Sequence, residues 1–327
     1  MDAAQAMARA VELSAAALGS TSPNPPVGAV LLDRDGEPVG EGATQPPGGP
    51  HAEVVALRQA GVRGYGGTLV CTLEPCRHVG RTGPCTSAIA EAGIARVVYA
   101  AADVTPDAAG GAEVLRAAGI EVEQLDVRVE PLEPWLHAQR RGRPYVTWKY
   151  AATLDGRSAA ADGTSRWITG EGARADVHRL RREVDAVLVG VGTVLADDPE
   201  LTVRPDPGRQ PLRVVLDRSG RTPADARVRD ALVLADEPRQ ALERLYARGV
   251  VSVLLEGGPT VAASFVRAGL VDRVIAYVAP ALLGAGPAAV GGLGVGTIKG
   301  AHRLRLDEVL RVGDDVRLIM YPETRSA

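Results

Sequence analysis

The first part of the chain alternates amphipathic runs with short apolar runs rich in β-branched residues. Apolar positions at helical spacing predict helices over 3–18, 52–59, 86–92 and 112–118. Apolar runs predict strands over 27–32, 68–73, 97–101 and 120–122, with a further extended run around Val39. This alternation predicts an α/β sheet with helices packed on its faces.

The pattern restarts after residue 144. Apolar runs predict strands over 145–152, 186–191, 213–217, 232–235, 251–256, 274–278 and 316–321, and helical spacing predicts a helix over 174–182. The segment 131–144 between the two halves combines prolines with a basic run, which is typical of a polar connector. We therefore predict two α/β domains, residues 1–144 and 145–327.

Composition narrows the class of protein. The 327 residues are 46% hydrophobic and 24% charged, which fits a globular chain able to bury a core. The net charge of −3 gives no general attraction for a phosphate backbone or an anionic membrane, so we expect no nucleic-acid partner. The uncharged stretch 274–298 contains two prolines and six glycines, which favours a strand and a Gly-rich loop over a membrane span.

Targeting signals are not expected either. The first 20 residues are interrupted by charges and lack the continuous apolar core of a signal peptide. Three cysteines do not make a disulfide framework, so a reducing, cytoplasmic location is expected.

Four residues of the first half form a candidate catalytic zinc set. His51, Cys76 and Cys85 offer one imidazole and two thiolates, and three protein ligands leave a fourth position for water. His51 and Cys85 each follow a proline at a predicted helix start, where free N–H groups lower a cysteine's pKa. Glu53, two residues after His51, can reach the open position and move a proton. The pattern is typical of zinc-dependent nucleobase deaminases, although eight residues separate Cys76 from Cys85.

Two other residues test this interpretation. Cys71 lies within a predicted strand and is expected to be a small buried hydrophobic residue. His78 could act as a fourth ligand and make the zinc purely structural, but Glu53 would then have no role.

Three runs of the first half, 22–28, 50–54 and 72–85, closely resemble the bifunctional deaminase/reductase of riboflavin biosynthesis. The long insertion between the two cysteines, with its Gly-Arg-Thr at 80–82, is a feature of that family. The resemblance implies a cytidine-deaminase-like three-layer domain with Zn²⁺ on the three ligands and Glu53 as proton shuttle. It also implies that Asn24 and His78 lie near the pyrimidine.

Three further runs indicate the activity of the second half. They are 149–157 with 165–169, 190–204 and 255–262. In the last run Gly257 and Gly258 stand between a predicted strand and a helix. Glycines allow a ligand to approach the backbone, and the helix start points free N–H groups at it, which suits a phosphate or pyrophosphate. No Rossmann fingerprint is present, and a plain turn remains the alternative both here and for Gly190 and Gly192.

These runs resemble the reductase half of the same family, whose fold is similar to dihydrofolate reductase. The resemblance implies an NADPH site formed by Ala151, Ala152, Trp167, Thr193, Asp197, Gly258, Pro259, Thr260, Val261, Ala262, Ala263 and Ser264. It implies a substrate site formed by Ser165, Arg181, Leu201, Arg204 and Glu256. Arginines suit a ribose-phosphate substrate because a guanidinium binds phosphate oxygens in pairs, although Arg181 could instead be one of several solvated helix charges.

Arg218 marks a departure from the family pattern. Many relatives have a serine directly after the strand that ends here in Asp217, whereas this chain has Arg218 and then Ser219. An arginine near the adenosine ribose accommodates a 2′-phosphate, so we expect Arg218 to contact that group of NADPH.

The resemblance covers residues 7–321 and implies two consecutive reactions. The first is hydrolytic deamination of 2,5-diamino-6-ribosylamino-4(3H)-pyrimidinone 5′-phosphate, and the second is NADPH-dependent reduction of the ribosyl group to ribityl. A homo-oligomer formed through the reductase domain is a further expectation. The alternatives are a deaminase acting on bases in nucleic acid, which needs a basic channel and aromatic platforms, and an inactive zinc-binding module.

Overall fold

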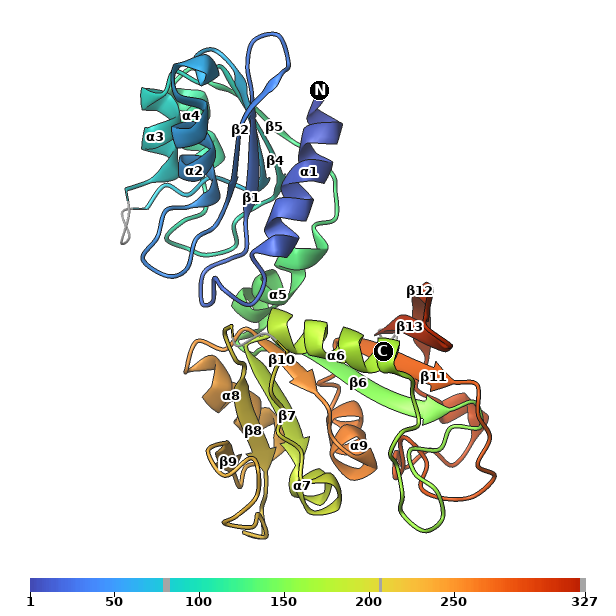
Figure 1. Cartoon of the computed structure of the whole chain (residues 1–327). Helices are drawn as coiled ribbons and strands as arrows, with labels where there is room; N and C mark the ends of the chain where they lie inside the picture. The colour runs from blue at the N-terminus through green and yellow to red at the C-terminus, as the bar shows by residue number, and fades with distance from the viewer. Residues whose placement is uncertain (79–82, 206–207, 324–327) are drawn as a thin grey trace. The chain divides into compact units, whose positions relative to one another are not determined.

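The computed structural model describes residues 1–78, 83–205 and 208–323 and forms two compact units, Met1–Gly142 and Arg143–Ala327. Each unit has its own sheet (Figure 1). Within the described residues, no helix is both long enough and apolar enough to cross a membrane.

The first unit is a five-stranded sheet between two layers of helices. Its strands are β1 (Gly28–Leu32), β2 (Pro38–Ala43), β3 (Thr68–Leu73), β4 (Arg96–Ala101) and β5 (Glu121–Gln124), in the order β2-β1-β3-β4-β5. β1 is antiparallel to β2 and β3, whereas β3, β4 and β5 are parallel. Helix α1 (Ala3–Ala16) covers one face, and α2 (Ala52–Ala60), α3 (Cys85–Glu91) and α4 (Gly111–Ala117) cover the other (Figure 1). The predicted three-layer arrangement is confirmed.

Two glycines on β2 set the position of α2. A Cβ atom on Gly40 would lie 2.2 Å from the Ala56 carbonyl oxygen, and one on Gly42 would lie 2.1 Å from the Ala52 carbonyl oxygen. Both glycines are buried on the strand face that meets the helix. The backbone of α2 therefore lies directly on the sheet, close to its first turn.

The segment between the units is not the polar connector predicted from the sequence. Residues Glu130–Leu132 form a 3-10 turn, η2, and Glu133–Arg141 form helix α5, which ends at Gly142 with φ 64°. Trp135 and Ala138 are buried on one face of α5, and the Trp135 indole donates a 3.1 Å hydrogen bond to the Pro23 carbonyl. The prediction was wrong because this buried face stabilises a helix despite the surrounding prolines and arginines.

The second unit has an eight-stranded sheet in the order β12-β13-β11-β6-β10-β7-β8-β9. The strands are β6 (Tyr145–Thr153), β7 (Ala186–Gly190), β8 (Leu212–Leu216), β9 (Leu232–Leu234), β10 (Ser252–Leu255), β11 (Arg273–Ala279), β12 (Leu304–Val312) and β13 (Asp315–Pro322). The strands from β11 to β9 are parallel, β13 is antiparallel to β11, and β12 is antiparallel to β13. The Gly-rich stretch after β11 is a loop with one 3-10 turn, η3 (Ile298–Gly300), as predicted.

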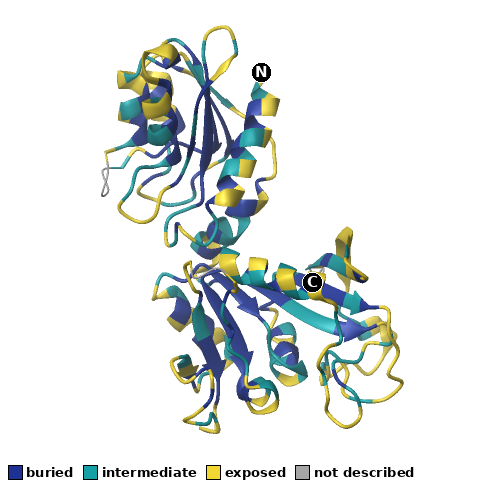
Figure 2. Ribbon diagram, in the orientation of Figure 1, coloured by how far each residue is buried: buried dark blue, intermediate teal, exposed yellow. Residues whose placement is uncertain are grey.

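Alternating residues of this sheet serve two hydrophobic cores. Helix α6 (Glu171–Glu183) packs on the face that includes Val187 and Val189 of β7. Helices α8 (Pro238–Tyr246) and α9 (Pro259–Arg267) pack on the face that includes Ala186 and Leu188. Figure 2 shows the central strands buried, whereas β12 is exposed. Because helices cover both faces of this sheet, a ligand is expected at the carboxyl ends of its parallel strands.

Candidate functional site

The predicted metal ligands of the first unit converge. His51 is the residue before α2, Cys85 is the first residue of α3, and Cys76 lies in the loop after β3. The His51 Nδ1 atom lies 3.2 Å from the Cys85 Sγ atom and 3.5 Å from the Cys76 Sγ atom. Three chain segments distant in sequence therefore place one nitrogen and two sulfurs within 4.8 Å of one another.

These separations suit a tetrahedral zinc ion. With Zn–N near 2.0–2.1 Å and Zn–S near 2.3 Å, tetrahedral angles place a nitrogen and a sulfur ligand about 3.6 Å apart. The two measured N–S distances are 3.2 and 3.5 Å, so the ligands could close on zinc with small adjustments. Imidazole and thiolates are the donors that zinc prefers, and the set leaves a fourth coordination position free of protein ligands among the described residues.

Glu53 lies beside this group on the first turn of α2 and is only 4% exposed. Burial, followed by the negative charge of Cys76, raises the pKa of the Glu53 carboxyl. Cys85 is close enough to hydrogen bond with it. A buried carboxyl with a raised pKa next to a metal group is suited to taking up and releasing a proton near neutral pH.

The three cysteines differ in what sets the pKa of their thiols. The hydrogen bond from Cys85, and then that with His51, lower the pKa of Cys76 to about 4 despite partial burial. The pKa of Cys85 is raised because its thiol is the donor to Cys76. Burial raises the pKa of Cys71, which is fully buried in β3, so Cys71 is the inert hydrophobic residue that its strand position predicted.

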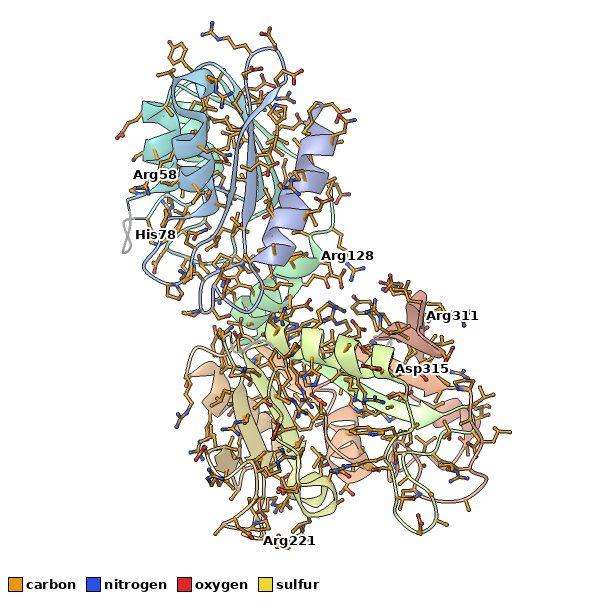
Figure 3. All side chains as sticks on the ribbon, in the orientation of Figure 1. Arg58, His78, Arg128, Arg221, Arg311 and Asp315 are labelled. Atoms are coloured by element: carbon orange, nitrogen blue, oxygen red, sulfur yellow. The ribbon has the colours of Figure 1, made fainter. Side chains whose placement is uncertain are left out.

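The structure gives less support for direct roles of Asn24 and His78. The Asn24 backbone N–H donates to the Thr21 carbonyl at 2.9 Å, and among the described residues the Asn24 side chain makes no hydrogen bond with the metal ligands. His78 is half-buried, its Nδ1 atom has no hydrogen-bond partner within the described part of the chain, and it is not one of the convergent ligands (labelled in Figure 3). The family insertion at 79–82 lies outside the described residues.

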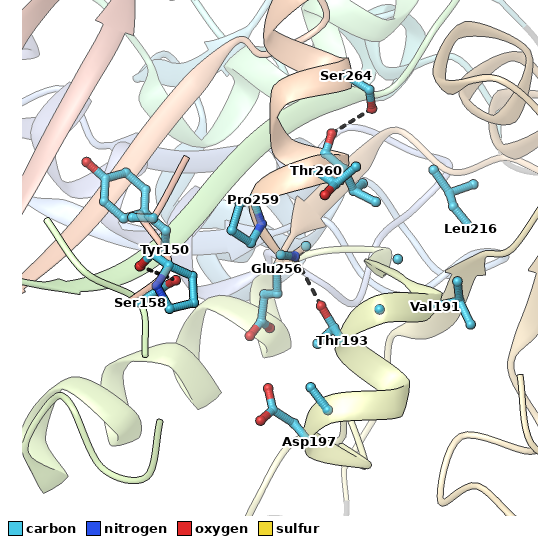
Figure 4. Close-up of a pocket in the computed structure, with 18 of the residues that line it drawn as sticks. Tyr150, Ser158, Val191, Thr193, Asp197, Leu216, Glu256, Pro259, Thr260 and Ser264 are labelled. Carbon is cyan, nitrogen blue, oxygen red and sulfur yellow. Dashed lines mark hydrogen bonds between the residues drawn. The ribbon is translucent and has the colours of Figure 1, made fainter. Parts of the chain in front are cut away.

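The second candidate site is a cavity of about 840 Å³ at the carboxyl ends of the parallel strands of the second unit. Lys149 and Ala151 of β6, Gly190 at the end of β7 and Leu216 at the end of β8 line it, together with residues of the loop after β10. The Gly258 N–H donates a 3.0 Å hydrogen bond to the Thr193 hydroxyl across it (Figure 4). The volume and the position suit a small-molecule or cofactor site.

A buried ionic group occupies one end of this cavity. Arg181 Nε and Nη2 donate to the two Glu256 carboxylate oxygens at 2.6 and 3.0 Å, and Arg181 Nη1 donates to the Thr202 carbonyl at 3.0 Å. The Lys149 Nζ atom lies 3.9 Å from Glu256 and 6.0 Å from the centre of the Tyr277 ring. Burial lowers the pKa of Lys149, while Glu256 opposes this shift. Arg181 is therefore not a solvated helix charge; it fixes the Glu256 carboxylate.

The residues predicted for the reductase site divide into three groups by position. Those that line the cavity are Ala151, Ser165, Thr193, Asp197, Arg218, Glu256, Gly258, Pro259, Thr260, Val261 and Ser264. Those buried or largely buried away from the cavity lining are Ala152, Arg181, Leu201, Ala262 and Ala263. Trp167 and Arg204 are exposed outside it, and Trp167 lies under the Arg174 guanidinium at 4.5 Å.

Other residues of the cavity were not singled out by the sequence patterns. Lys149 lies at the Glu256 end, and Arg221, Asp236 and Glu237 lie at the opposite end, after β8 and β9. Lys149 begins the run 149–157 that resembles the reductase family, and a single lysine in an otherwise apolar strand is a signal that could have identified it. The sequence spacing of Arg221, Asp236 and Glu237 gives no sign that the loops after β8 and β9 lie next to each other.

Two family models match the chain. Residues 144–318 match the RibD C-terminal domain, and residues 1–101 match the cytidine and deoxycytidylate deaminase zinc-binding region. The riboflavin biosynthesis protein RibD of Mycobacterium tuberculosis (strain CDC 1551) is 50% identical, over 96% of this chain and 96% of its own. The protein of the same name from Escherichia coli K12 is 40% identical, over 95% and 97%.

Solved structures agree with these matches. Acinetobacter baumannii RibD is 38% identical and superposes with a TM-score of 0.90 over 98% of this chain and 99% of its own. A diaminohydroxyphosphoribosylaminopyrimidine deaminase/5-amino-6-(5-phosphoribosylamino)uracil reductase from Thermotoga maritima is 35% identical, with a TM-score of 0.90 over 98% of both chains.

Proposed function

This chain belongs to the RibD family of bifunctional deaminase/reductases of riboflavin biosynthesis, and we propose how its residues carry out the two reactions. It is a zinc-dependent deaminase in its first part and an NADPH-dependent reductase in its second. The observation that carries the proposal is the convergence of His51, Cys76 and Cys85 beside the buried Glu53. We assign the activities to residues 1–144 and 145–327.

In the deaminase, His51 Nδ1 and the two sulfurs hold the metal. When bound, Zn²⁺ supplies Lewis-acid activation of water at neutral pH. Glu53 takes up a proton from the attacking water and delivers it to the departing amino group, because its buried carboxyl faces the ligand set and its pKa is raised. The protonated amino group then leaves as ammonia. Asn24 and His78 are proposed to position the pyrimidine.

In the reductase, the cavity residues orient a sugar against a nicotinamide. NADPH supplies the hydride when bound. We assign the glycine turn at 257–258 and the start of α9 to its pyrophosphate, since glycines allow close approach to the backbone and N–H groups of a first helical turn bind anions. The Gly258 N–H already donates to Thr193 and Pro259 has no N–H, so the N–H groups that follow Pro259 serve this role. Arg218, Thr193 and Asp197 serve the cofactor.

The ionic end of the cavity serves the substrate. Glu256 is held by Arg181 and Lys149, so that a carboxylate and an ammonium group lie together where the sugar is to be reduced. Lys149 is suited to donating the proton needed as the ribose ring opens, since burial lowers its pKa. Ser165, Leu201 and Arg204 complete the proposed substrate site. The exposed Arg204 guanidinium, which pairs with Glu200 at 3.2 Å, is assigned to the substrate phosphate.

The assembly and location of the enzyme complete the proposal. We assign a homo-oligomer to the reductase domain, supported by the exposed edge strand β12, on which Leu306, Val309 and Leu310 face solvent. The enzyme acts in the cytoplasm on a small molecule and binds no nucleic acid, consistent with its net charge of −3. A nucleic-acid deaminase or an inactive zinc module would leave the match over residues 144–318 unexplained.

One assay tests both reactions. The purified protein is given 2,5-diamino-6-ribosylamino-4(3H)-pyrimidinone 5′-phosphate and NADPH, and ammonia release and nicotinamide absorbance are followed together. We expect one ammonia released and one NADPH oxidised per substrate converted. Ammonia release without NADPH oxidation, or the reverse in the absence of added intermediate, would refute the two-step assignment.

A further inference from the structure

Two loops on the β6 side of the reductase cavity are joined along their length. Residues 154–165 follow β6, and residues 281–292 follow its neighbour in the sheet, β11 (Figure 1). Backbone hydrogen bonds of 2.9–3.0 Å connect the two loops, joining Leu154 to Ala281, Ser158 to Pro287 and Gly156 to Ala289. The two segments are about 130 positions apart in the sequence and nevertheless form one structural unit.

The inner side of this unit is a wall of the cavity. Ser158 and Ala159 line the cavity from the first loop, and Pro287 and Ala289 line it from the second (Ser158 is labelled in Figure 4). Because these loops leave β6 and β11, the wall closes the cavity on the side where Lys149 of β6 also lies.

Hydrophobic burial does little to hold the start of the second loop. Leu282 is 73% exposed and Leu283 is 40% exposed. The backbones of the two loops also touch, since a Cβ atom on Gly286 would lie 2.2 Å from the Ala159 carbonyl oxygen. The position of the wall therefore depends on the hydrogen bonds between the loops.

The Asp155 carboxylate fastens the second loop to the end of β6. Its Oδ2 atom accepts a 2.7 Å hydrogen bond from the Gly284 N–H. Its Oδ1 atom accepts from the Leu283 N–H at 3.2 Å and from the hydroxyl of the buried Thr153 at 2.6 Å. The hydrogen bonds from Thr153 and then Gly284 lower the pKa of Asp155 to about 2, so the carboxylate is ionised at neutral pH. Both oxygens are thus engaged in charge-assisted hydrogen bonds.

We infer that Asp155 is a positioning residue of the reductase, which places Pro287 and Ala289 in the cavity wall by holding Leu283 and Gly284. Asp155 does not line the cavity and acts only through the second loop. The inference rests on the proposed function of this cavity, because the wall then bounds the space in which the nicotinamide and the sugar meet.

Asp155→Asn in the full chain tests the inference. An amide has one acceptor oxygen, so its NH₂ group would face either the Gly284 N–H or the donors from Thr153 and Leu283, and the fastening would open. Asp162→Asn is the matched control. Asp162 is exposed and does not line the cavity, and its carboxylate accepts from the N–H and hydroxyl of Thr164 in its own loop, at 2.9 and 2.7 Å.

Hydrogen exchange and steady-state kinetics are measured on the same preparations. In Asp155→Asn the amides of residues 283–284 should exchange about tenfold faster or more, the usual effect of losing a charge-assisted hydrogen bond. The KM for NADPH or for the supplied intermediate should rise about tenfold, because a displaced wall loses contact with the bound molecule. Deamination should stay within about twofold, and Asp162→Asn should match the wild-type chain throughout.

The KM values distinguish positioning from simple destabilisation. A less stable protein loses active enzyme, which lowers the apparent kcat but leaves both KM values unchanged. Arg157→Ala provides a second variant should Asp155→Asn fail to fold. It removes the 3.0 Å hydrogen bond from Arg157 Nη1 to the Gly286 carbonyl and should change exchange and KM in the same direction.

The inference is overturned if Asp155→Asn exchanges like Asp162→Asn over residues 281–289. It is equally overturned if exchange accelerates there while both KM values stay at the wild-type level. The proposed function is tested separately on the wild-type chain, and a wild-type chain that reduces no intermediate would refute it. An active wild-type chain with Asp155→Asn indistinguishable from Asp162→Asn would refute only the role of Asp155.

Discussion

A methyl group added to Gly42 should displace the first turn of α2 and with it the deaminase site. The new Cβ would lie 2.1 Å from the Ala52 carbonyl oxygen, and α2 must withdraw by about 1.3 Å to restore an ordinary contact of 3.4 Å. Ala52 stands between His51 and Glu53, so both move with it. A misplacement of about 1 Å can cost about 10²-fold in rate, and overpacking typically costs about 1–3 kcal/mol of stability.

Gly42→Ala is therefore expected to lower deaminase turnover about 100-fold while leaving the reductase near its wild-type rate. Ammonia release, NADPH oxidation with supplied intermediate, bound zinc and thermal unfolding are measured on the same preparation. Gly296→Ala is the control, because a Cβ there meets nothing within 4 Å. Full deaminase turnover in a folded Gly42→Ala protein would refute the argument that this contact positions the site.

Three further predictions concern single side chains. Glu53→Gln should keep zinc and reductase activity while deamination falls about 10²- to 10⁴-fold, and ammonia release at a near-normal rate would exclude Glu53 as the proton carrier. Arg181→Ala leaves the buried Glu256 with Lys149 alone and should destabilise the second domain by up to about 3–5 kcal/mol in denaturant unfolding, so unchanged stability would contradict a structural pair. Although burial opposes it, hydrogen bonds from Thr222, Arg221 and Ser219 lower the pKa of Asp217 from 3.8 to about 2. The ionised Asp217 should therefore stabilise the second domain above pH 4, and this stabilisation should be lost as the pH falls towards 2. Asp217→Asn should remove that loss of stability, which calorimetric unfolding of the full chain at several pH values can follow.

The metal group was predictable because its signals are local. Prolines before His51 and Cys85 mark helix starts, and both residues stand at helix starts in the structure. The loop after β3 brings in Cys76. The central strands were predictable for a similar reason. Each of them buries a continuous run of apolar residues, and that run is visible in the sequence.

The far end of the reductase cavity was not predictable in the same way. Arg218 and Glu237 meet only because β8 and β9 are neighbours in the sheet, and no spacing along the chain encodes that adjacency. Strand β12 was missed because its residues from 304 to 311 are all exposed, so no apolar face distinguishes it. Helix α5 was missed because its buried face consists of only two residues, Trp135 and Ala138, among prolines and arginines.

Removal and return of zinc is the most direct test of the central claim that one chain holds two separate chemistries. The purified enzyme is treated with a chelator, metal content is measured, and both reactions are assayed before and after zinc is added back. We expect deamination to disappear with the metal and to return with about one zinc per chain, while NADPH-dependent reduction of the supplied intermediate persists throughout. Deamination that survives complete loss of zinc would contradict the account.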